Sequence, residues 1–451
     1  MQSHSENQAP PPGCPAHGSG MGIPLYNREF AQNPGAYYDY MRQLGPAAHV
    51  ELAPRVNAHL VTGYGLALHV LQNPDTFRRD SRRWTDLNEG RIPLDSPVLP
   101  MMVYRPGPIY SDGKEHLRLR QAMTDCLMRV DVRRMSRLVD GISEYLIDQV
   151  KGKGKVDLVK EYAQVLPLLV YNDLFGCPAE LGDNLVFGIS GIFDGTNAEK
   201  ANQVLQEALV ELVALKRAKP GDDVISWLMQ HEARLTDEEM YPLIIQLVAG
   251  GTEPLGNLIS SSLALLLDVV KDDEMNSGGM MVEDAIDEVL WNAAPIANYA
   301  THFPVQSVDL GGIRLNAGDP VVISFAAANT DPSLSGARQT LSKRAHLAWG
   351  AGPHACPAKD PALLISTRAI ENLLKALHDI ELAVPSDALT WRPGPFHRAL
   401  SSLPARFTPV KTIPKEEPVP AARIAGSPRP DNAPVQKEKG PWGKFLAWWT
   451  G

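Results

Sequence analysis

The chain of 451 residues is poor in cysteine, with only Cys14, Cys126, Cys177 and Cys356, and these four lie far apart. Their spacing excludes a disulfide framework and paired-cysteine zinc motifs. No segment approaches the roughly 18 apolar residues that a membrane-spanning helix needs. Acidic residues outnumber basic ones, giving a net charge of −9, so nucleic acid is not an expected partner. We therefore expect a cytoplasmic protein without a transmembrane segment.

Composition divides the chain into three parts. Residues 1–20 are polar and rich in Pro and Gly, which predicts a flexible leader. Residues 21–409 form the predicted globular domain, and residues 410–451 a Pro-rich extension that ends in an aromatic segment. We expect that segment to dock onto the body or onto a protein partner, although a functionless end is an open alternative. The Cys14 and His17 pair could be half a metal site, but a leader without structure is favoured.

The periodicity of apolar residues predicts a mainly α protein with small β-sheets, an α+β fold. The predicted helices are Gly113–Leu127, Val132–Val150, Asp157–Phe175, Ala198–Lys216, Asp237–Val270 and Val282–Asn292. The predicted strands are Ala48–Leu52, Ala58–Thr62, Val305–Leu310, Ile313–Leu315 and Val321–Phe325.

The most informative segment is His346-Leu-Ala-Trp-Gly-Ala-Gly-Pro-His-Ala-Cys356. Gly350 and Gly352 allow a tight turn that can pass close to a flat ligand. Cys356 follows just before a predicted helix, whose N-terminal dipole favours a thiolate. A buried structural cysteine is the alternative for any single thiol.

This segment resembles the heme-binding loop of the cytochrome P450 family, Phe-x-x-Gly-x-x-x-Cys-x-Gly, matched here by Trp349, Gly352, Cys356 and Ala358. The resemblance implies heme b with the Cys356 thiolate as axial ligand of the iron. It also implies the P450 fold, with the heme between a long oxygen-binding helix and the cysteine loop. Ala358 replaces a glycine, which limits the amides available to the sulfur.

The resemblance further implies partners for the two heme propionates. His116 and Arg120 are four residues apart and share one helix face. His354 lies on the cysteine loop, and His302 stands where the family usually has an arginine. Such anions need cationic or hydrogen-bonding donors.

The oxygen-binding helix of the family carries (Ala/Gly)-Gly-x-(Asp/Glu)-Thr, matched by Gly250, Gly251, Thr252, Glu253 and Pro254. The glycines would leave room for dioxygen, and Glu253 is the predicted acid for proton delivery. Pro254 replaces the family's threonine and has no hydroxyl. The resemblance therefore leaves Thr252, an ordered water or the substrate to supply that hydroxyl.

A second departure affects the family's Glu-x-x-Arg motif, which here is Glu288-x-x-Trp291. This variant resembles an actinobacterial group of cytochromes P450. We expect Trp291 to fill space by packing, and Arg338 or Arg344 to hold a buried Glu288 carboxylate.

By resemblance, four regions line the substrate pocket. The predicted wall residues are Trp84, Met101, Met102, Val103, Leu247, Gly250, Gly251, Pro254, Ile296, Asn298, Tyr299, Leu400 and Ser401. The side chains of Asn298 and Tyr299 would offer polar groups among apolar neighbours, which favours a small aromatic substrate.

The expected function is a bacterial heme-thiolate oxidase of specialised metabolism that uses O2. No flavin or iron–sulfur motif is present in the sequence, so a separate ferredoxin and ferredoxin reductase are expected, docking near Lys343, Arg344 and Lys359. Hydroxylation and oxidative coupling by C–C or C–N bond formation are both open; a tryptophan-containing cyclic dipeptide joined to a nucleobase or second aromatic ring is one candidate. The alternative is a catalytically degenerate heme-binding accessory or regulatory protein. A monomer is expected, but the sequence does not determine the oligomeric state.

Overall fold

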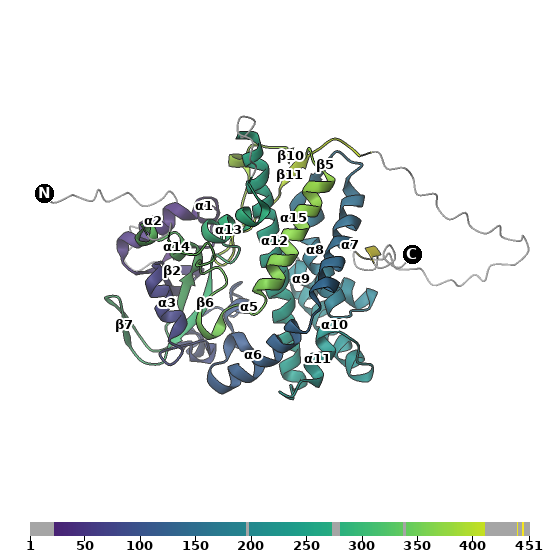
Figure 1. The fold of residues 1–451 in the computed structure, drawn as a ribbon. Coiled ribbons are helices and arrows are strands. Elements are labelled where there is room, and N and C mark those ends of the chain that lie inside the picture. Colours follow the sequence, from purple (N-terminus) through teal and green to yellow (C-terminus); the bar gives the residue numbers. More distant parts are fainter. Residues whose placement is uncertain are drawn as a thin grey trace, which may run out of the picture.

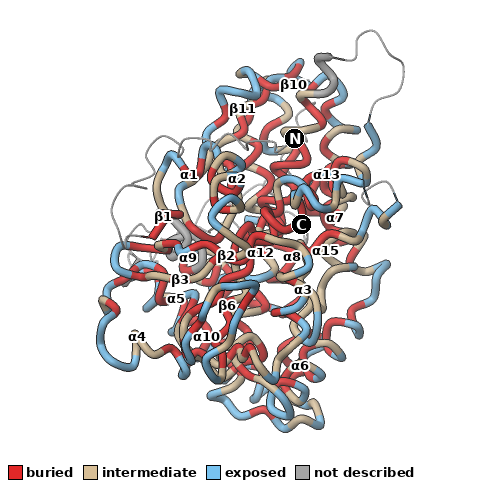
Figure 2. The backbone as a smooth tube through the Cα atoms, turned by 90° about the vertical axis from the view of Figure 1, so that its left-hand side faces the viewer, coloured by how far each residue is buried: buried red, intermediate tan, exposed pale blue. Residues whose placement is uncertain are grey.

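The computed structural model describes residues 22–194, 198–272, 280–336 and 340–410, together with Gly440, Lys444 and Phe445. A sheet region and a helical region lie side by side (Figure 1). Figure 2 shows buried residues running through the interior, with exposed residues on the outer turns and loops. The predicted leader, Cys14, His17, Arg338 and most of the C-terminal extension lie outside the described residues.

The sheet region contains a six-stranded sheet in the order β1-β2-β3-β9-β6-β4. Its strands are β1 (Ile23–Pro24), β2 (Ala47–Ala53), β3 (Val56–Val61), β9 (Val321–Ser324), β6 (Asn298–Pro304) and β4 (Phe77–Arg78). The accompanying helices are α1 (Arg28–Gln32), α2 (Pro34–Leu44), α3 (Tyr64–Gln72), α4 (Thr85–Asn88), α5 (Leu99–Met102) and α14 (Phe325–Asn329). Two small sheets pair β5 (Lys155–Asp157), β11 (Pro404–Arg406) and β10 (Glu381–Leu382), and β7 (Val308–Leu310) with β8 (Ile313–Leu315).

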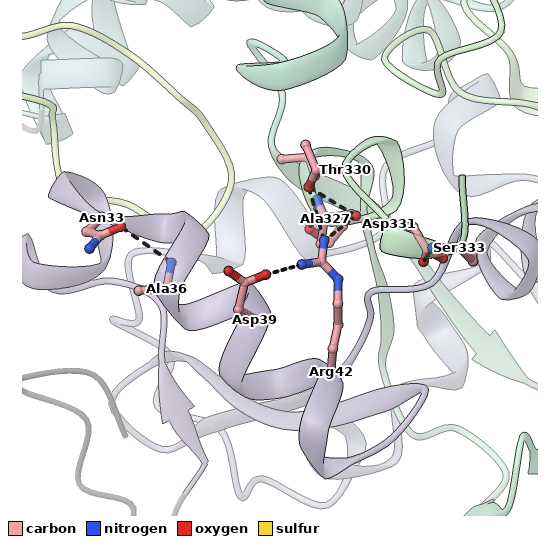
Figure 3. A network of polar contacts seen from close by, with 10 residues as sticks. Asn33, Ala36, Asp39, Arg42, Ala327, Thr330, Asp331 and Ser333 are labelled. Carbon is pink, nitrogen blue, oxygen red and sulfur yellow. Dashed lines mark hydrogen bonds and ion pairs between the residues drawn. The ribbon is translucent and has the colours of Figure 1, made fainter. Parts of the chain in front are cut away.

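Polar contacts fix α2 against the end of α14 (Figure 3). Arg42 donates to the Ala327 carbonyl at 2.7 Å and to Thr330 Oγ1 at 3.0 Å, and it also pairs with Asp39. These bonds connect residues nearly 290 positions apart, so they hold the N-terminal helices to the sheet region.

The helical region is built around α12 (Asp237–Asp272). Its other helices are α6 (Gly113–Met128), α7 (Val132–Val150), α8 (Val165–Leu174), α9 (Ala179–Asp194), α10 (Ala198–Ala218), α11 (Val224–Gln230), α13 (Val282–Asn292) and α15 (Lys359–Ala376). Three acidic residues in the first turn of α12 favour its start there by opposing the helix dipole. Both α8 and α15 pack against α12 (Figure 1). Among the described residues, no helix has the length and apolarity to cross a bilayer.

The predicted helices and strands are confirmed within a few residues, with one exception of each kind. Asp157 ends strand β5, a π-helical turn follows at Val159–Ala163, and only then does α8 begin, so the single helix predicted over Asp157–Phe175 is wrong at its start. The predicted strand Val305–Leu310 is shortened to Val308–Leu310, since β6 ends at Pro304. Sequence periodicity gave no sign of β6 or α9.

The C-terminal aromatic segment reaches the body at Phe445. This ring is 1% exposed and meets the Tyr145 ring of α7 edge-on, at 5.4 Å between centroids. The Lys444 amide donates to the Gly440 carbonyl at 2.9 Å. The expected docking onto the body is therefore observed for Phe445, while the tryptophans of the segment lie outside the described residues.

Candidate heme and oxygen site

The cysteine loop adopts the tight turn expected from its glycines. Gly350 and Gly352 have φ of +70° and +68°, which a side chain would strain. A Cβ on Gly352 would lie 2.3 Å from the Leu71 carbonyl oxygen of α3, so no larger residue fits. The Cys356 amide donates to the Trp349 carbonyl at 2.8 Å, and the loop delivers the cysteine just before α15.

The Cys356 sulfur lies among groups that act in opposite directions on its charge. Burial raises the pKa of the thiol, while a hydrogen bond from the Ala358 amide and the nearby Arg120 guanidinium lower it. Few backbone amides were expected to donate to this sulfur, and the Ala358 amide is one that does. A metal ion at this sulfur would deprotonate it outright.

Four predicted heme-contacting side chains converge from three elements. His116 and Arg120 come from α6, His354 from the cysteine loop and His302 from β6. The His116 and His354 rings are 4.1 Å apart between centroids. Arg120 donates to the Ala355 carbonyl and to Thr124 Oγ1.

Burial keeps the imidazoles of this cluster neutral in the absence of an anion. It lowers the pKa of His116 to about 4, with a further effect of His354, and it holds the pKa of His302 well below its ordinary value. His116 Nε2 is buried without a hydrogen-bond partner among the described residues. An unpaired imidazole nitrogen near the Arg120 guanidinium fits a group that carries carboxylates, as heme does.

One member of this cluster, Arg79, was not predicted from the sequence. Its side chain is only 5% exposed, and it donates to the carbonyls of Ile109 at 3.1 Å and Thr301 at 2.6 Å. Its charge raises the cost of protonating His302. Arg79 follows β4, whose pairing with β6 was not predicted.

The two glycines of α12 have different surroundings. A Cβ on Gly250 would meet nothing within 4 Å, so this residue borders open space. A Cβ on Gly251 would lie 2.0 Å from the Tyr171 phenol of α8, so Gly251 permits close helix packing. Pro254 stands one turn after Gly250 and has no amide hydrogen, so it cannot donate to the Gly250 carbonyl. That carbonyl is left available as an acceptor on the open face.

These surroundings predict opposite effects of alanine at the two glycines. We expect Gly251→Ala to lower the free energy of unfolding by about 1–3 kcal/mol, because the methyl group overlaps the Tyr171 ring. Gly250→Ala is the matched control and should leave stability unchanged or raise it by up to about 1 kcal/mol, since alanine favours helices. Urea unfolding of both variants measures the difference. Equal stabilities would contradict the assigned packing.

Glu253 is buried, with 9% exposure, at the centre of a polar network. It forms an ion pair with Arg392 and accepts from Asn257 Nδ2 at 3.2 Å. Asn257 in turn accepts from Gln164 Nε2 at 2.9 Å. Arg392, Asn257 and Gln164 were not predicted, because the three lie on separate segments or belong to no motif.

The predicted alternative hydroxyl, Thr252, does not share the face of Gly250 and Pro254. At 100° per residue, Thr252 points about 200° away from Gly250 around the helix. Its Oγ1 is buried, with no hydrogen-bond partner among the described residues. The geometry therefore argues against Thr252 and leaves a water or the substrate to supply the hydroxyl.

The Glu-x-x-Trp variant is also explained locally. Trp291 is 5% exposed, donates from Nε1 to the Lys343 carbonyl at 2.6 Å and meets the His346 ring edge-on. The indole thus connects α13 to the segment before the cysteine loop. The expectation of a buried Glu288 was wrong, because this carboxylate is exposed and accepts from Asn292. Among the described residues no ion pair joins Arg344 to it.

Trp291 should accordingly matter more than the glutamate of the same motif. We expect Trp291→Phe to lower the free energy of unfolding by about 1–3 kcal/mol, because the buried Lys343 contact is lost. Glu288→Gln should change it by less than about 0.5 kcal/mol, as an exposed substitution. Urea unfolding of the heme-loaded variants tests this, and a larger effect at Glu288 would reverse the assignment.

The residues predicted to line the substrate pocket differ in where the structure places them. The hydroxyls of Tyr110 and Tyr299 both donate to the Met101 carbonyl, at 3.0 and 3.3 Å. This pins the α5 segment beside Tyr299, and the Met101 side chain is 36% exposed. Leu247 lies on the Gly250 face of α12, as expected from the helical repeat. No ligand contact tests Met102, Val103, Ile296 or Ser401, which stay predictions.

Three predicted wall residues are packed in the protein interior. Asn298 is fully buried, accepts from Tyr38 at 3.1 Å and donates to the Pro395 carbonyl at 2.7 Å. Trp84 is 0% exposed and packs near Phe303, and Leu400 is 1% exposed in the helical core. Interior packing accounts for all three side chains, and their contact with a substrate stays a prediction.

The fold, the cysteine loop and the donor cluster define a heme-thiolate protein. Cytochrome P450 monooxygenase PikC from Streptomyces venezuelae is 30% identical over 399 residues, covering 84% of this chain and 92% of PikC. The 2-hydroxy-5-methyl-1-naphthoate 7-hydroxylase of Streptomyces carzinostaticus is 29% identical, covering 77% and 89% of the two chains. The structure of CYP154C4 from Streptomyces sp. W2061 matches with a TM-score of 0.75 at 26% identity, over 85% of this chain and 97% of that one. A search of family models gave no match.

The chain belongs to the cytochrome P450 family. It is an oxidoreductase whose cofactor is heme, with a cysteine thiolate as axial ligand. Because the named relatives are monooxygenases or hydroxylases, we set aside the alternative of a degenerate accessory protein.

Proposed function

We propose that this P450 oxidises a small aromatic substrate in bacterial specialised metabolism, with electrons from a separate ferredoxin and its reductase. The relative that hydroxylates a naphthoate supports the aromatic class. The tyrosine-rich wall at Tyr110, Tyr299 and Met101 supports it further, since aromatic rings favour stacking and edge contacts. When bound, the heme supplies the activation of O2.

The observation that carries the proposal is the composition of the α12 face. Gly250 leaves the space open and offers a carbonyl acceptor, while Pro254 removes the hydroxyl of the family pattern. Glu253 lies 60° from Gly250 on the same side of the helix and is the acid that can hold a proton there. Asn257 orients its carboxylate, and Arg392 has to separate from it before a proton can pass.

Hydroxylation and coupling differ in what they demand of this face. Hydroxylation inserts one oxygen atom, whereas coupling removes one hydrogen from each partner and forms a C–C or C–N bond, the hydrogens leaving with reduced oxygen as water. Position 254 has no hydroxyl to assist Glu253, and a second bound partner can supply the missing hydrogen-bond donor, which favours coupling. A tryptophan-containing cyclic dipeptide is one substrate consistent with an aromatic, mixed-polarity wall.

Optical titration followed by product analysis tests the proposal. The purified heme protein is titrated with a tryptophan-containing cyclic dipeptide and with an aliphatic cyclic dipeptide as control. We expect a spin-state shift with the aromatic ligand alone. With surrogate ferredoxin, reductase and a nucleobase, mass spectrometry should show a joined product. A product with one added oxygen atom would show that the enzyme hydroxylates rather than couples. Equal spin-state shifts with both dipeptides would contradict an aromatic substrate class.

A further inference from the structure

The pairing of β4 with β6 brings Arg79 opposite His302. The antiparallel register joins Phe77 to Pro304 and Arg78 to Phe303. Continued by one residue beyond the end of β4, this register would set Arg79 across from His302, and the charge of Arg79 lowers the pKa of that imidazole. Directly opposite residues of an antiparallel pair have side chains on the same face, within contact of each other.

Arg79 is a buried cation that forms no ion pair with a carboxylate of the described residues. Nε and Nη1 donate to two backbone carbonyls, and the guanidinium carbon lies 5.8 Å from the centroid of the Tyr299 ring. Nη2 makes no hydrogen bond within the described part of the chain. The carboxylate of Asp112 accepts from the backbone amides of Arg79 at 3.0 Å and Asp80 at 3.3 Å, and its other oxygen lies 3.8 Å from His354 Nε2. A buried charge left in this state is costly, so the site is built for an anion from outside the polypeptide.

The surroundings of Arg79 identify that anion as a carboxylate of the heme. His302, His354 and His116 approach the same space, and each is a donor that the family resemblance assigns to the propionates. Burial keeps His302 neutral, and its Nδ1 is already engaged with the Ala300 carbonyl at 2.5 Å. His302 therefore cannot replace the charge of the arginine usually found at its position.

We propose that Arg79 supplies the permanent positive charge for a heme propionate, the arginine of the family pattern having moved from β6 to the facing position after β4. The proposal depends on the heme assignment but not on the substrate or the reaction. A guanidinium can bind a carboxylate through two parallel hydrogen bonds, and its free Nη2 is suited to this.

Transfer of hemin to an excess of a heme-scavenging globin tests the proposal without turnover. We expect Arg79→Gln to lose hemin about tenfold to a hundredfold faster, as a charge-assisted hydrogen bond is removed. The double variant R79Q/H302R should recover most of the loss, because the charge returns from the opposite strand. Arg82→Gln is the matched control: Arg82 is exposed and paired with Asp80 at 2.8 Å, so its rate should not change.

Three results would overturn the proposal. The double variant could lose hemin as fast as R79Q, which would show that Arg79 acts by holding the Ile109 and Thr301 carbonyls. Hemin loss could be unchanged in R79Q while binding of 1-naphthoate, but not of 1-naphthamide, weakens, which would assign the anion to a substrate. If R79Q does not fold, Arg79→Met and R79M/H302R replace it, and absence of recovery again counts against the proposal. A normal thiolate-type CO band in R79Q separates these results from a failure of the Cys356 assignment.

Discussion

Cys356→Ser is expected to abolish the thiolate-type absorption band of the reduced CO complex and to reduce NADPH-driven turnover by a thousandfold or more, about 4 kcal/mol of activation free energy. The serine hydroxyl stays protonated near neutral pH, so it cannot donate electron density to the iron as a thiolate does. Arg120 and the Ala358 amide are placed to stabilise a negative sulfur, and they would face an uncharged oxygen instead. Spectra of the heme-loaded variant, reduced under CO, measure the change.

Cys126→Ser is the matched control for this substitution. Cys126 is a buried thiol on α6, and burial raises its pKa to about 11. Its replacement should leave the CO band intact while lowering stability, because a hydroxyl is buried in the core. A thiolate-type band that survived in Cys356→Ser and disappeared in Cys126→Ser would show that the wrong cysteine had been assigned.

Glu253→Gln should have the second largest effect, a loss of about a hundredfold in product formation. Glutamine has nearly the same shape and can still accept from Asn257, but it can neither hold nor release the proton. It also ends the ion pair with Arg392. Electrons would still arrive from the reductase, so we expect NADPH consumption to fall less than product formation. The ratio of product formed to NADPH consumed measures this.

Glu288→Gln on α13 provides the control for the loss of a carboxylate, because Glu288 is exposed and accepts only from the neighbouring Asn292 among the contacts described above. Arg392→Gln tests the pairing itself: it should alter the pH dependence of product formation while leaving the CO band unchanged, since Arg392 acts through Glu253. An unchanged ratio of product to NADPH in Glu253→Gln would remove Glu253 from proton delivery.

Local sequence signals were sufficient for the long helices and for the cysteine loop. The α7 boundaries, Val132 to Val150, were predicted in full, because Asp131 caps the helix and its apolar residues repeat on one face. Gly350 and Gly352 required a turn with positive φ whatever the rest of the fold. These features depend on residues close together in the sequence.

Features that depend on distant partners could not be predicted. β6 contains a register shift between Tyr299 and His302, with Ala300 at a φ of +54°, so its residues do not alternate as in a regular strand. Without β6, the position of Arg79 opposite His302 is not visible. The exposure of Glu288 follows from how α13 is rotated against its neighbours, and the sequence motif alone suggested the opposite.

The docking of Phe445 makes the end of the chain behave as an intramolecular ligand for the body. Its occupancy depends on an effective concentration, which the length of residues 411–443 sets. Doubling that length would cost only about 0.6 kcal/mol of closure free energy. Losing the ring itself would forfeit the whole contact with Tyr145. Sequence changes in the connecting segment should thus be tolerated far better than a change at Phe445.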